Sequence, residues 1–196
     1  MLHIPYFHGH SWSALSREER FYSFTLYEHA RVDPTDFARW VAETAEPKFD
    51  IAGEDEWDIG VEVCLYRDLL WHRGEKTARE IGFSPKRTFD LCLFGARTII
   101  IIEAKAFLGF ESEQNKMFAE DARRIGKLPE MKDVKVILVA LASSKYFKAM
   151  DKRGDRQTLE LFNGIISWAA TFEKYRDTLL LQAEELYRSK IHRLSL

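Results

Sequence analysis

The feature that most constrains this chain is the segment FDLCLFGARTIIIIEAK, which spans residues 89–105. Two apolar runs flank Gly95-Ala96, a dipeptide that favours a tight turn, so the segment predicts a β-hairpin with strands over 88–94 and 98–107. The second run is apolar at consecutive positions, whereas a surface strand would alternate apolar and polar residues. The hairpin is therefore expected inside a sheet that is covered on both faces.

Three charged residues stand in this apolar hairpin. Asp90 opens the first strand, and Glu103 and Lys105 close the second. Because side chains alternate along a strand, Glu103 and Lys105 share one face. The expected turn gives residue pairs that sum to about 191 or 192, which places Asp90 opposite Ile101 or Ile102 and within two positions of Glu103. Ionised groups beside a packed sheet cost several kcal/mol unless something compensates.

A divalent cation is one such compensation. Two carboxylates are hard oxygen ligands of the kind that Mg²⁺ prefers, and water and a substrate phosphate complete its octahedron. We therefore expect Asp90 and Glu103 to hold Mg²⁺, with Mn²⁺ as a substitute. Lys105 would lie beside the metal, where it could orient or deprotonate an attacking water or neutralise charge on a phosphate. The arrangement is typical of enzymes that cleave phosphodiester bonds.

The remaining elements are predicted from periodicity, caps and turns. Ser16 and Glu19 have the spacing of a capping box, and Phe21, Phe24 and Tyr27 follow at helical intervals. Further helices are expected over 33–41, 54–72, 112–125, 157–170 and 172–189, and further strands over 78–83 and 134–141. The helix over 54–72 is based on an apolar stripe formed by Trp57, Val61, Cys64, Leu65 and Leu69.

From residue 54 onward the expected order is helix, three strands, helix, strand. The three strands can pair as an antiparallel meander, and the helix after them is long enough to be a crossover that sets the last strand parallel to a neighbour. This predicts an α/β fold with three layers, α/β/α, around a mixed central sheet. Residues 1–53 are expected to form a helical extension packed on the core, and 54–196 the core with C-terminal helices, in a single domain overall.

The hairpin and its surroundings resemble the PD-(D/E)XK nuclease superfamily, which has the restriction-endonuclease-like fold. Members carry an Asp on the second core strand and Glu-x-Lys on the third, in the element order αβββαβ. Asp90 and Glu103-Ala104-Lys105 match these positions, although Phe89 replaces the usual proline. The resemblance covers roughly residues 54–141 and implies a metal-dependent nuclease with DNA as the expected substrate. It also implies that Asp90, Glu103 and the Ala104 carbonyl hold Mg²⁺, while Lys105 assists the water nucleophile.

Two further positions fit the resemblance. Many members carry a glutamate on the first core helix that contributes to the metal site, and Glu62 occupies such a place within the expected helix. The alternatives are Asp58, one turn earlier on the same side, and an edge glutamate whose carboxylate lies in water. Gln114 opens the next helix with Phe118 four residues later, similar to the Gln-x-x-x-Tyr motif of the RecB-like branch. An exposed glutamine at a helix start is the competing interpretation of Gln114.

Three histidines near the N-terminus and a basic cluster after the last strand are weaker candidates. His3, His8 and His10 could bind metal, but no nearby cysteine or carboxylate completes a set. The basic cluster could follow a nucleic-acid backbone or could be a solvated loop; it consists of Lys145, Lys148, Lys152, Arg153 and Arg156. The formal net charge of −2 gives no global basic signature, so a homodimer or another protein partner is expected to help bind nucleic acid.

Two other functional interpretations are open. One is a catalytically silent nuclease-like module for nucleic-acid binding or protein assembly. The other is an ordinary α/β domain with an accidental motif, which predicts that Glu103 and Lys105 lie on solvent far from Asp90. The N-terminus lacks a basic flank before an apolar run, and the longest apolar run is too short to span a bilayer, so neither a signal peptide nor a membrane segment is expected. The two cysteines, Cys64 and Cys92, fit a cytoplasmic location.

Overall fold

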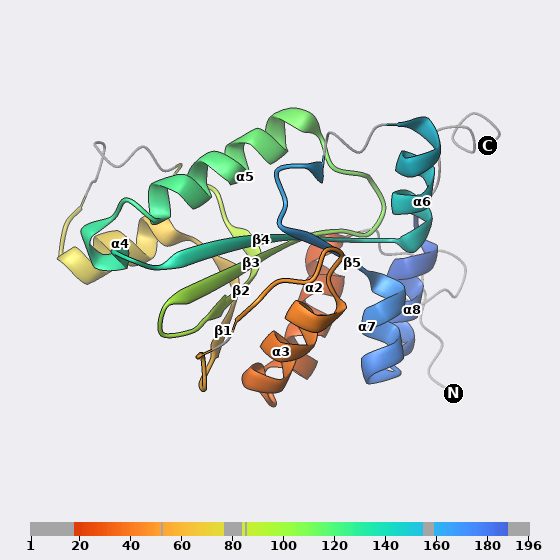
Figure 1. Ribbon diagram of the computed structural model, residues 1–196, viewed down its shortest axis with the longest axis horizontal. Coiled ribbons are helices and arrows are strands. Elements are labelled where there is room, and N and C mark those ends of the chain that lie inside the picture. The colour runs from red at the N-terminus through yellow and green to blue at the C-terminus, as the bar shows by residue number, and fades with distance from the viewer. Residues whose placement is uncertain (1–17, 52, 77–83, 85, 155–158, 188–196) are drawn as a thin grey trace, which may run out of the picture.

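The fold is built on a five-stranded mixed sheet, which Figure 1 shows in the computed structural model. The structure describes residues 18–51, 53–76, 84, 86–154 and 159–187. The strands lie in the order of the chain and are β1 (Asp58–Val63), β2 (Phe89–Phe94), β3 (Thr98–Lys105), β4 (Lys135–Ala142) and β5 (Gly164–Ser167). The first three strands form an antiparallel meander, and β4 and β5 continue the sheet in parallel with β3.

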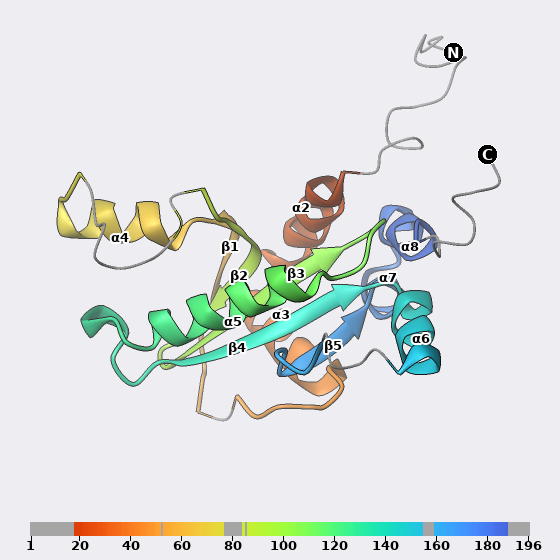
Figure 2. The ribbon, with the colours of Figure 1, turned by 90° about the horizontal axis from the view of Figure 1, so that it is seen from above.

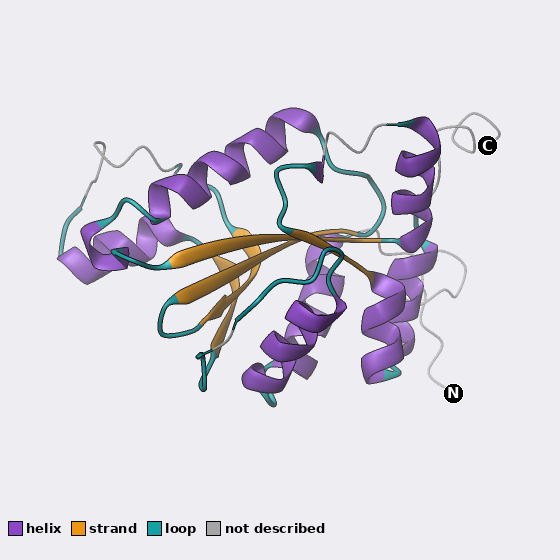
Figure 3. Cartoon of the chain, in the orientation of Figure 1, coloured by secondary structure: helices purple, strands orange, loops and turns teal. Residues whose placement is uncertain are grey.

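Helices cover both faces of the sheet, so the expected three-layer α/β/α architecture is confirmed (Figures 1 and 3). One face carries α4 (Leu65–Arg73), α5 (Ser112–Ile125), the short 3₁₀ helix η2 (Pro129–Met131) and α6 (Ser144–Arg153). The opposite face carries α2 (Glu19–Ala30), α3 (Pro34–Thr44), α7 (Trp168–Tyr175) and α8 (Thr178–Glu185). The N-terminal helices α2 and α3 therefore share one hydrophobic cluster with the sheet.

Alternation along β3 divides the core into two clusters. Ile100, Ile102 and Ala104 pack with α2, α3, α7 and α8. Ile99 and Ile101 point the other way and pack with α4, α5 and α6. Full burial of one such branched side chain contributes about 1.5–3 kcal/mol, which explains why a run of consecutive isoleucines requires a helical layer on each face.

The helix α5 is the crossover between the parallel strands β3 and β4, as expected. Figure 2 shows it running along β4, with which it is in contact. The α5 side chains Phe118 and Ile125 are buried against the sheet, and Ala122 of the same helix packs against this cluster. The helix ends at Gly126, close to the predicted stop. The crossover therefore connects the carboxyl end of β3 to the start of β4.

The helix expected over 54–72 is wrong, because strand β1 and the short helix α4 occupy that segment. Val61 packs into the cluster on the α2 side, whereas Val63, two residues later, packs into the cluster on the α5 side. Glu62 between them has a φ of 51°, in the left-handed region that non-glycine residues rarely adopt, and this reverses the faces. The change of face interrupts the alternation of apolar and polar side chains that identifies a strand. The apolar residues that remain have the spacing expected of a helix.

Three other expectations need correction. The single helix expected over 172–189 is interrupted, because α7 ends at Tyr175, Arg176 has a φ of 57°, and α8 begins at Thr178. The helix expected over 157–170 is wrong: α6 precedes this segment, and strand β5 and the start of α7 lie within it. The hairpin turn lies one residue later than expected, because the Gly95 N–H donates to the Thr98 carbonyl at 2.8 Å. The strand expected over 78–83 lies outside the described residues. Within the described residues, no helix combines the length and the apolar character needed to cross a bilayer.

Candidate functional site

The two carboxylates of the hairpin lie at the same level of neighbouring strands. Leu91 pairs with Ile102 and Cys92 with Ile101, so Asp90 falls opposite Glu103 rather than opposite an isoleucine. Asp90 accepts a hydrogen bond at its Oδ2 from the Ala104 N–H at 2.8 Å. Glu103 is only 3% exposed. The one-residue shift of the turn thus brings the two acids closer than the sequence alone suggested.

A hollow of about 290 Å³ lies over these carboxylates at the end of the meander. Its lining includes every side chain of the predicted site: Glu62, Asp90, Glu103, Lys105 and Gln114. Sequence reasoning did not place the following residues there: Glu19, Arg20, Lys86, Arg87, Thr88 and Met117. The lining therefore contains four carboxylates and four cationic side chains within one small volume.

Lys105 is held by a glutamate that sequence reasoning did not assign to the site. Its Nζ donates to Glu19 Oε2 at 3.0 Å, and the lysine side chain is only 12% exposed. Glu19 is the first residue of α2, so the pair joins this helix to the end of β3. The Trp168 indole N–H donates to the Lys105 carbonyl at 3.0 Å and anchors the strand end. The spacing of Ser16 and Glu19 predicts a capping box, whereas α2 begins at Glu19 itself, with Glu18 as its N-cap.

Glu62 reaches the hollow from a strand instead of a helix. Its carboxylate accepts from the Thr88 hydroxyl at 2.8 Å and pairs with Arg20 at 3.1 Å. These two contacts support the left-handed backbone at Glu62, which costs roughly 1–2 kcal/mol in a residue with a Cβ. Asp58, the alternative to Glu62, pairs with Phe94 at the opposite end of β1 and is exposed. Asp58 does not line the hollow.

Burial controls the protonation of the acidic pair. Burial raises the pKa of Glu103 well above its ordinary value, and the neighbouring carboxylate of Asp90 raises it further. Burial also raises the pKa of Asp90 to about 6, although the Ala104 N–H and Lys105 partly oppose the increase. Burial lowers the pKa of Lys105, but Glu19 outweighs this effect, so the net shift is upward. The site therefore combines a protonated lysine with two carboxyls that retain protons more tightly than usual.

The described side chains around the hollow do not form a closed cage for a metal ion, but the two carboxylates of Asp90 and Glu103 are enough for an open Mg²⁺ site. Within the described ranges, no three His, Cys, Asp or Glu side chains form a group that could enclose a cation. Mg²⁺, however, is commonly bound through one or two carboxylates, with waters and substrate phosphates as its other ligands. The buried Oε1 of Glu103 has no hydrogen-bond partner among the described residues, which is a costly state that a cation would relieve. The cluster of His3, His8 and His10 lies outside the described residues.

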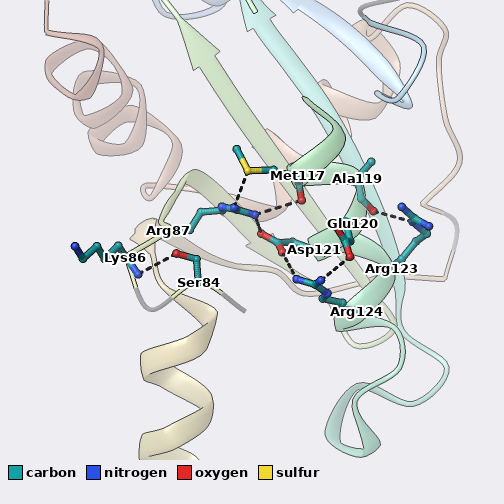
Figure 4. Close-up of polar contacts among 9 residues, drawn as sticks. All are labelled: Ser84, Lys86, Arg87, Met117, Ala119, Glu120, Asp121, Arg123 and Arg124. Carbon is teal, nitrogen blue, oxygen red and sulfur yellow. Dashed lines mark hydrogen bonds and ion pairs between the residues drawn. The ribbon is translucent and has the colours of Figure 1, made fainter. Parts of the chain in front are cut away.

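A cationic rim borders the hollow where β2 begins. Figure 4 shows Arg87 between this segment and α5, with its guanidinium directed at Asp121. Arg87 also donates to the Met117 carbonyl at 3.3 Å, and Asp121 lies 3.6 Å from Arg124. Lys86 is exposed, and Figure 4 shows its side chain pointing away from these contacts. The rim therefore has one fixed cation and one solvent-facing cation.

The basic cluster predicted after the last strand lies elsewhere. Lys145, Lys148, Lys152 and Arg153 belong to α6 and are exposed, and Arg156 lies outside the described residues. None of the four described residues lines the hollow.

Comparisons of the chain with protein-family models, with curated proteins and with solved structures found no match. The fold and the site define a mixed α/β domain whose antiparallel meander ends in the buried Glu103 and the half-buried Asp90, beside a lysine.

Proposed function

We propose that this chain is a metal-dependent nuclease that hydrolyses phosphodiester bonds, with DNA as its substrate. The observation that carries the proposal is the position of Asp90 and Glu103. They lie side by side on neighbouring strands, and a buried carboxyl oxygen of Glu103 lacks a partner in the part of the chain that the structure describes. Lys105 follows two residues later along the same strand. Ionisation of such a pair is costly without a cation, and a cation between two acids is the simplest compensation.

In this proposal Asp90 and Glu103 hold Mg²⁺ together with the Ala104 carbonyl, while Glu62, which pairs with Arg20 and Thr88, lines the same hollow. The metal would polarise the phosphoryl oxygen and lower the pKa of a bound water. The raised pKa of Lys105 keeps its ammonium protonated near neutral pH. The lysine is therefore better suited to orienting the water and neutralising charge on the phosphate than to removing a proton. Gln114 would position the phosphate or the water from the start of α5.

The order of elements supports membership of the PD-(D/E)XK nuclease superfamily as part of the same proposal. Apart from α4, which is inserted between β1 and β2, the sequence of β1, β2, β3, the crossover α5 and β4 follows the order of that superfamily's core. Helix α2 packs on the meander and takes the place that we had expected for a helix over 54–72. Its Glu19 then becomes the helix glutamate of the site. Cys64 and Cys92 are both buried, which fits a reducing compartment such as the cytoplasm.

The alternative is a silent nuclease-like module that binds nucleic acid without cutting it. One observation favours it: Lys105 and Glu62 already have ion-pair partners in Glu19 and Arg20. Such pairs would hold the fold without a metal. The two proposals differ in whether a divalent cation binds and whether phosphodiester bonds are cleaved.

The deciding experiment is a cleavage assay with single- and double-stranded DNA and RNA in Mg²⁺ or Mn²⁺. Asp90→Asn and Lys105→Ala should each lower the rate at least ~100-fold, because each removes a group that acts on the reacting phosphate. Asp58→Asn is the matched control, since Asp58 is an exposed strand aspartate at the far end of β1. Equal rates in all four proteins would refute the mechanism. Metal binding without cleavage of any substrate would favour the silent module.

A further inference from the structure

An apolar recess continues the hollow on the side of α2. Its lining residues are Glu18, Arg20, Phe21, Phe24, Val61 and Glu62. Arg20 and Glu62 also line the hollow of the carboxylates, so the two recesses share a wall. Phe24 is 52% exposed. The candidate site is therefore bordered by an accessible aromatic ring.

The packing of α2 does not account for this ring. The helix buries Tyr22, Leu26 and Ala30 against the sheet. Phe24 lies outside that buried face, and its ring packs against that of Tyr27, at 5.8 Å between centroids. Phe24 shares an apolar recess with Phe21 and Val61, and charged side chains rim this recess. An apolar surface with a polar rim is typical of a ligand-binding groove.

Cations complete the surface. Arg20 lines both recesses and pairs with Glu62 at 3.1 Å, and Lys86 and Arg87 line the hollow. Nucleic acid without sequence preference is bound by this combination: cations follow the phosphates while aromatic rings stack on successive bases. A base in a duplex is already stacked on both faces and cannot stack on Phe24. Only an unpaired base can do so.

We infer that this surface binds single-stranded nucleic acid, with one unpaired base stacked on Phe24 and the adjoining phosphate over Asp90, Glu103 and Lys105. The inference rests on the proposed nuclease function and specifies its substrate class. Because every base has a stacking face, the contact carries no sequence preference. A second copy of the chain fits the recess less well, because Glu18, Arg20 and Glu62 surround the ring and a self-complementary contact would bury these charges.

The test measures binding separately from cleavage. Fluorescence anisotropy of a labelled oligothymidylate is recorded in Ca²⁺ with the 196-residue chain. Phe24→Ala and Phe24→Leu should weaken binding about five- to hundred-fold, because both remove the ring, whereas Phe24→Trp should bind as tightly as the wild type. Trp71→Ala is the control, since Trp71 is 89% exposed but lies on α4 outside both recesses. Lys86→Ala should reduce the slope of log affinity against log salt by about 0.7.

Three results would overturn the inference. In the first, Phe24→Leu binds as tightly as the wild type, which would mean that stacking is not involved. In the second, a duplex of the same length binds equally well and with the same sensitivity to Phe24→Ala. In the third, Phe24→Ala converts a dimer into a monomer in light scattering while oligonucleotide binding is unchanged. Phe24-dependent binding without cleavage in Mg²⁺ or Mn²⁺ would instead refute the nuclease proposal and leave the binding surface in place.

Discussion

Replacing Asp90 by asparagine should make the metal-free protein more stable near neutral pH while abolishing its proposed activity. The pKa of Asp90 is raised from 3.8 to about 6, mainly by burial. Because one pKa unit corresponds to about 1.4 kcal/mol, keeping Asp90 ionised costs the metal-free fold up to about 3 kcal/mol. Asparagine is neutral, and its carboxamide oxygen can still accept the hydrogen bond from the Ala104 N–H. A gain of this size raises the melting temperature by about 6–12 °C in a domain of this length.

The pH dependence follows from the same shift. The folded state binds the Asp90 proton more tightly than the unfolded chain does. The contribution of Asp90 to stability is therefore fully present below about pH 4 and is lost as the pH rises through about 6. Asp90→Asn has no ionisable group at this position, so its stability is not lowered in the same way as the pH rises. Wild type and Asp90→Asn should consequently have similar free energies of unfolding near pH 4 and differ most at about pH 8.

The measurement is urea unfolding at both pH values, with EDTA or with excess Mg²⁺. Mg²⁺ should restore stability to the wild type at about pH 8 by an amount that rises with log concentration, and should leave Asp90→Asn unchanged. Asp58→Asn, in the exposed position at the other end of β1, should behave like the wild type throughout. The reasoning is refuted if Asp90→Asn is no more stable than the wild type in EDTA at about pH 8. It is refuted equally if Mg²⁺ stabilises both proteins to the same extent.

Three other substitutions test the structure. The free energy of unfolding of Glu62→Gly should be about 1 kcal/mol higher than that of Glu62→Ala, because only glycine adopts the φ of 51° without strain. Equal free energies of the two variants in urea unfolding would contradict this. Glu184→Ala should lower stability by about 3 kcal/mol, because its carboxylate accepts hydrogen bonds at the starts of both α6 and α7, and Glu184→Gln should recover part of the loss in the same assay. Arg87→Ala should lower stability by about 3 kcal/mol, because it leaves Asp121 buried without its closest cation. Adding Asp121→Asn should restore most of the lost stability, and a double-mutant cycle without such recovery would show that the two side chains do not form a stabilising ion pair.

The hairpin and its charges could be predicted from the sequence because the signals are local. The consecutive isoleucines require burial on both faces, and the alternation of side chains places Glu103 and Lys105 together. The exact register could not be read in the same way. It depends on which two residues occupy the turn, and Gly95-Ala96 and Ala96-Arg97 differ by one position. That single shift decides whether Asp90 meets an isoleucine or Glu103.

Other parts of the fold depend on contacts that no local pattern records. Glu19 and Lys105 are 86 positions apart, so nothing near either residue indicates their ion pair. Strand β5 has only four residues, Gly164–Ser167, which is too short for a period of two to stand out from its neighbours. Strand β1 was missed for a different reason. The left-handed backbone at Glu62 sends Val61 and Val63 to opposite faces, and the strand pattern disappears.

Three unfavourable features of this fold converge on one place. The left-handed Glu62, the raised pKa of Asp90 and the unpartnered Oε1 of Glu103 all belong to side chains around the same hollow. Local costs of this kind persist where function requires them and where the surrounding structure compensates. The accidental-motif interpretation required Glu103 and Lys105 to lie on solvent far from Asp90, but both are largely shielded and Glu103 is beside it. The convergence is therefore the physical reason to test this hollow first, with Asp90→Asn as the variant that separates stability from activity.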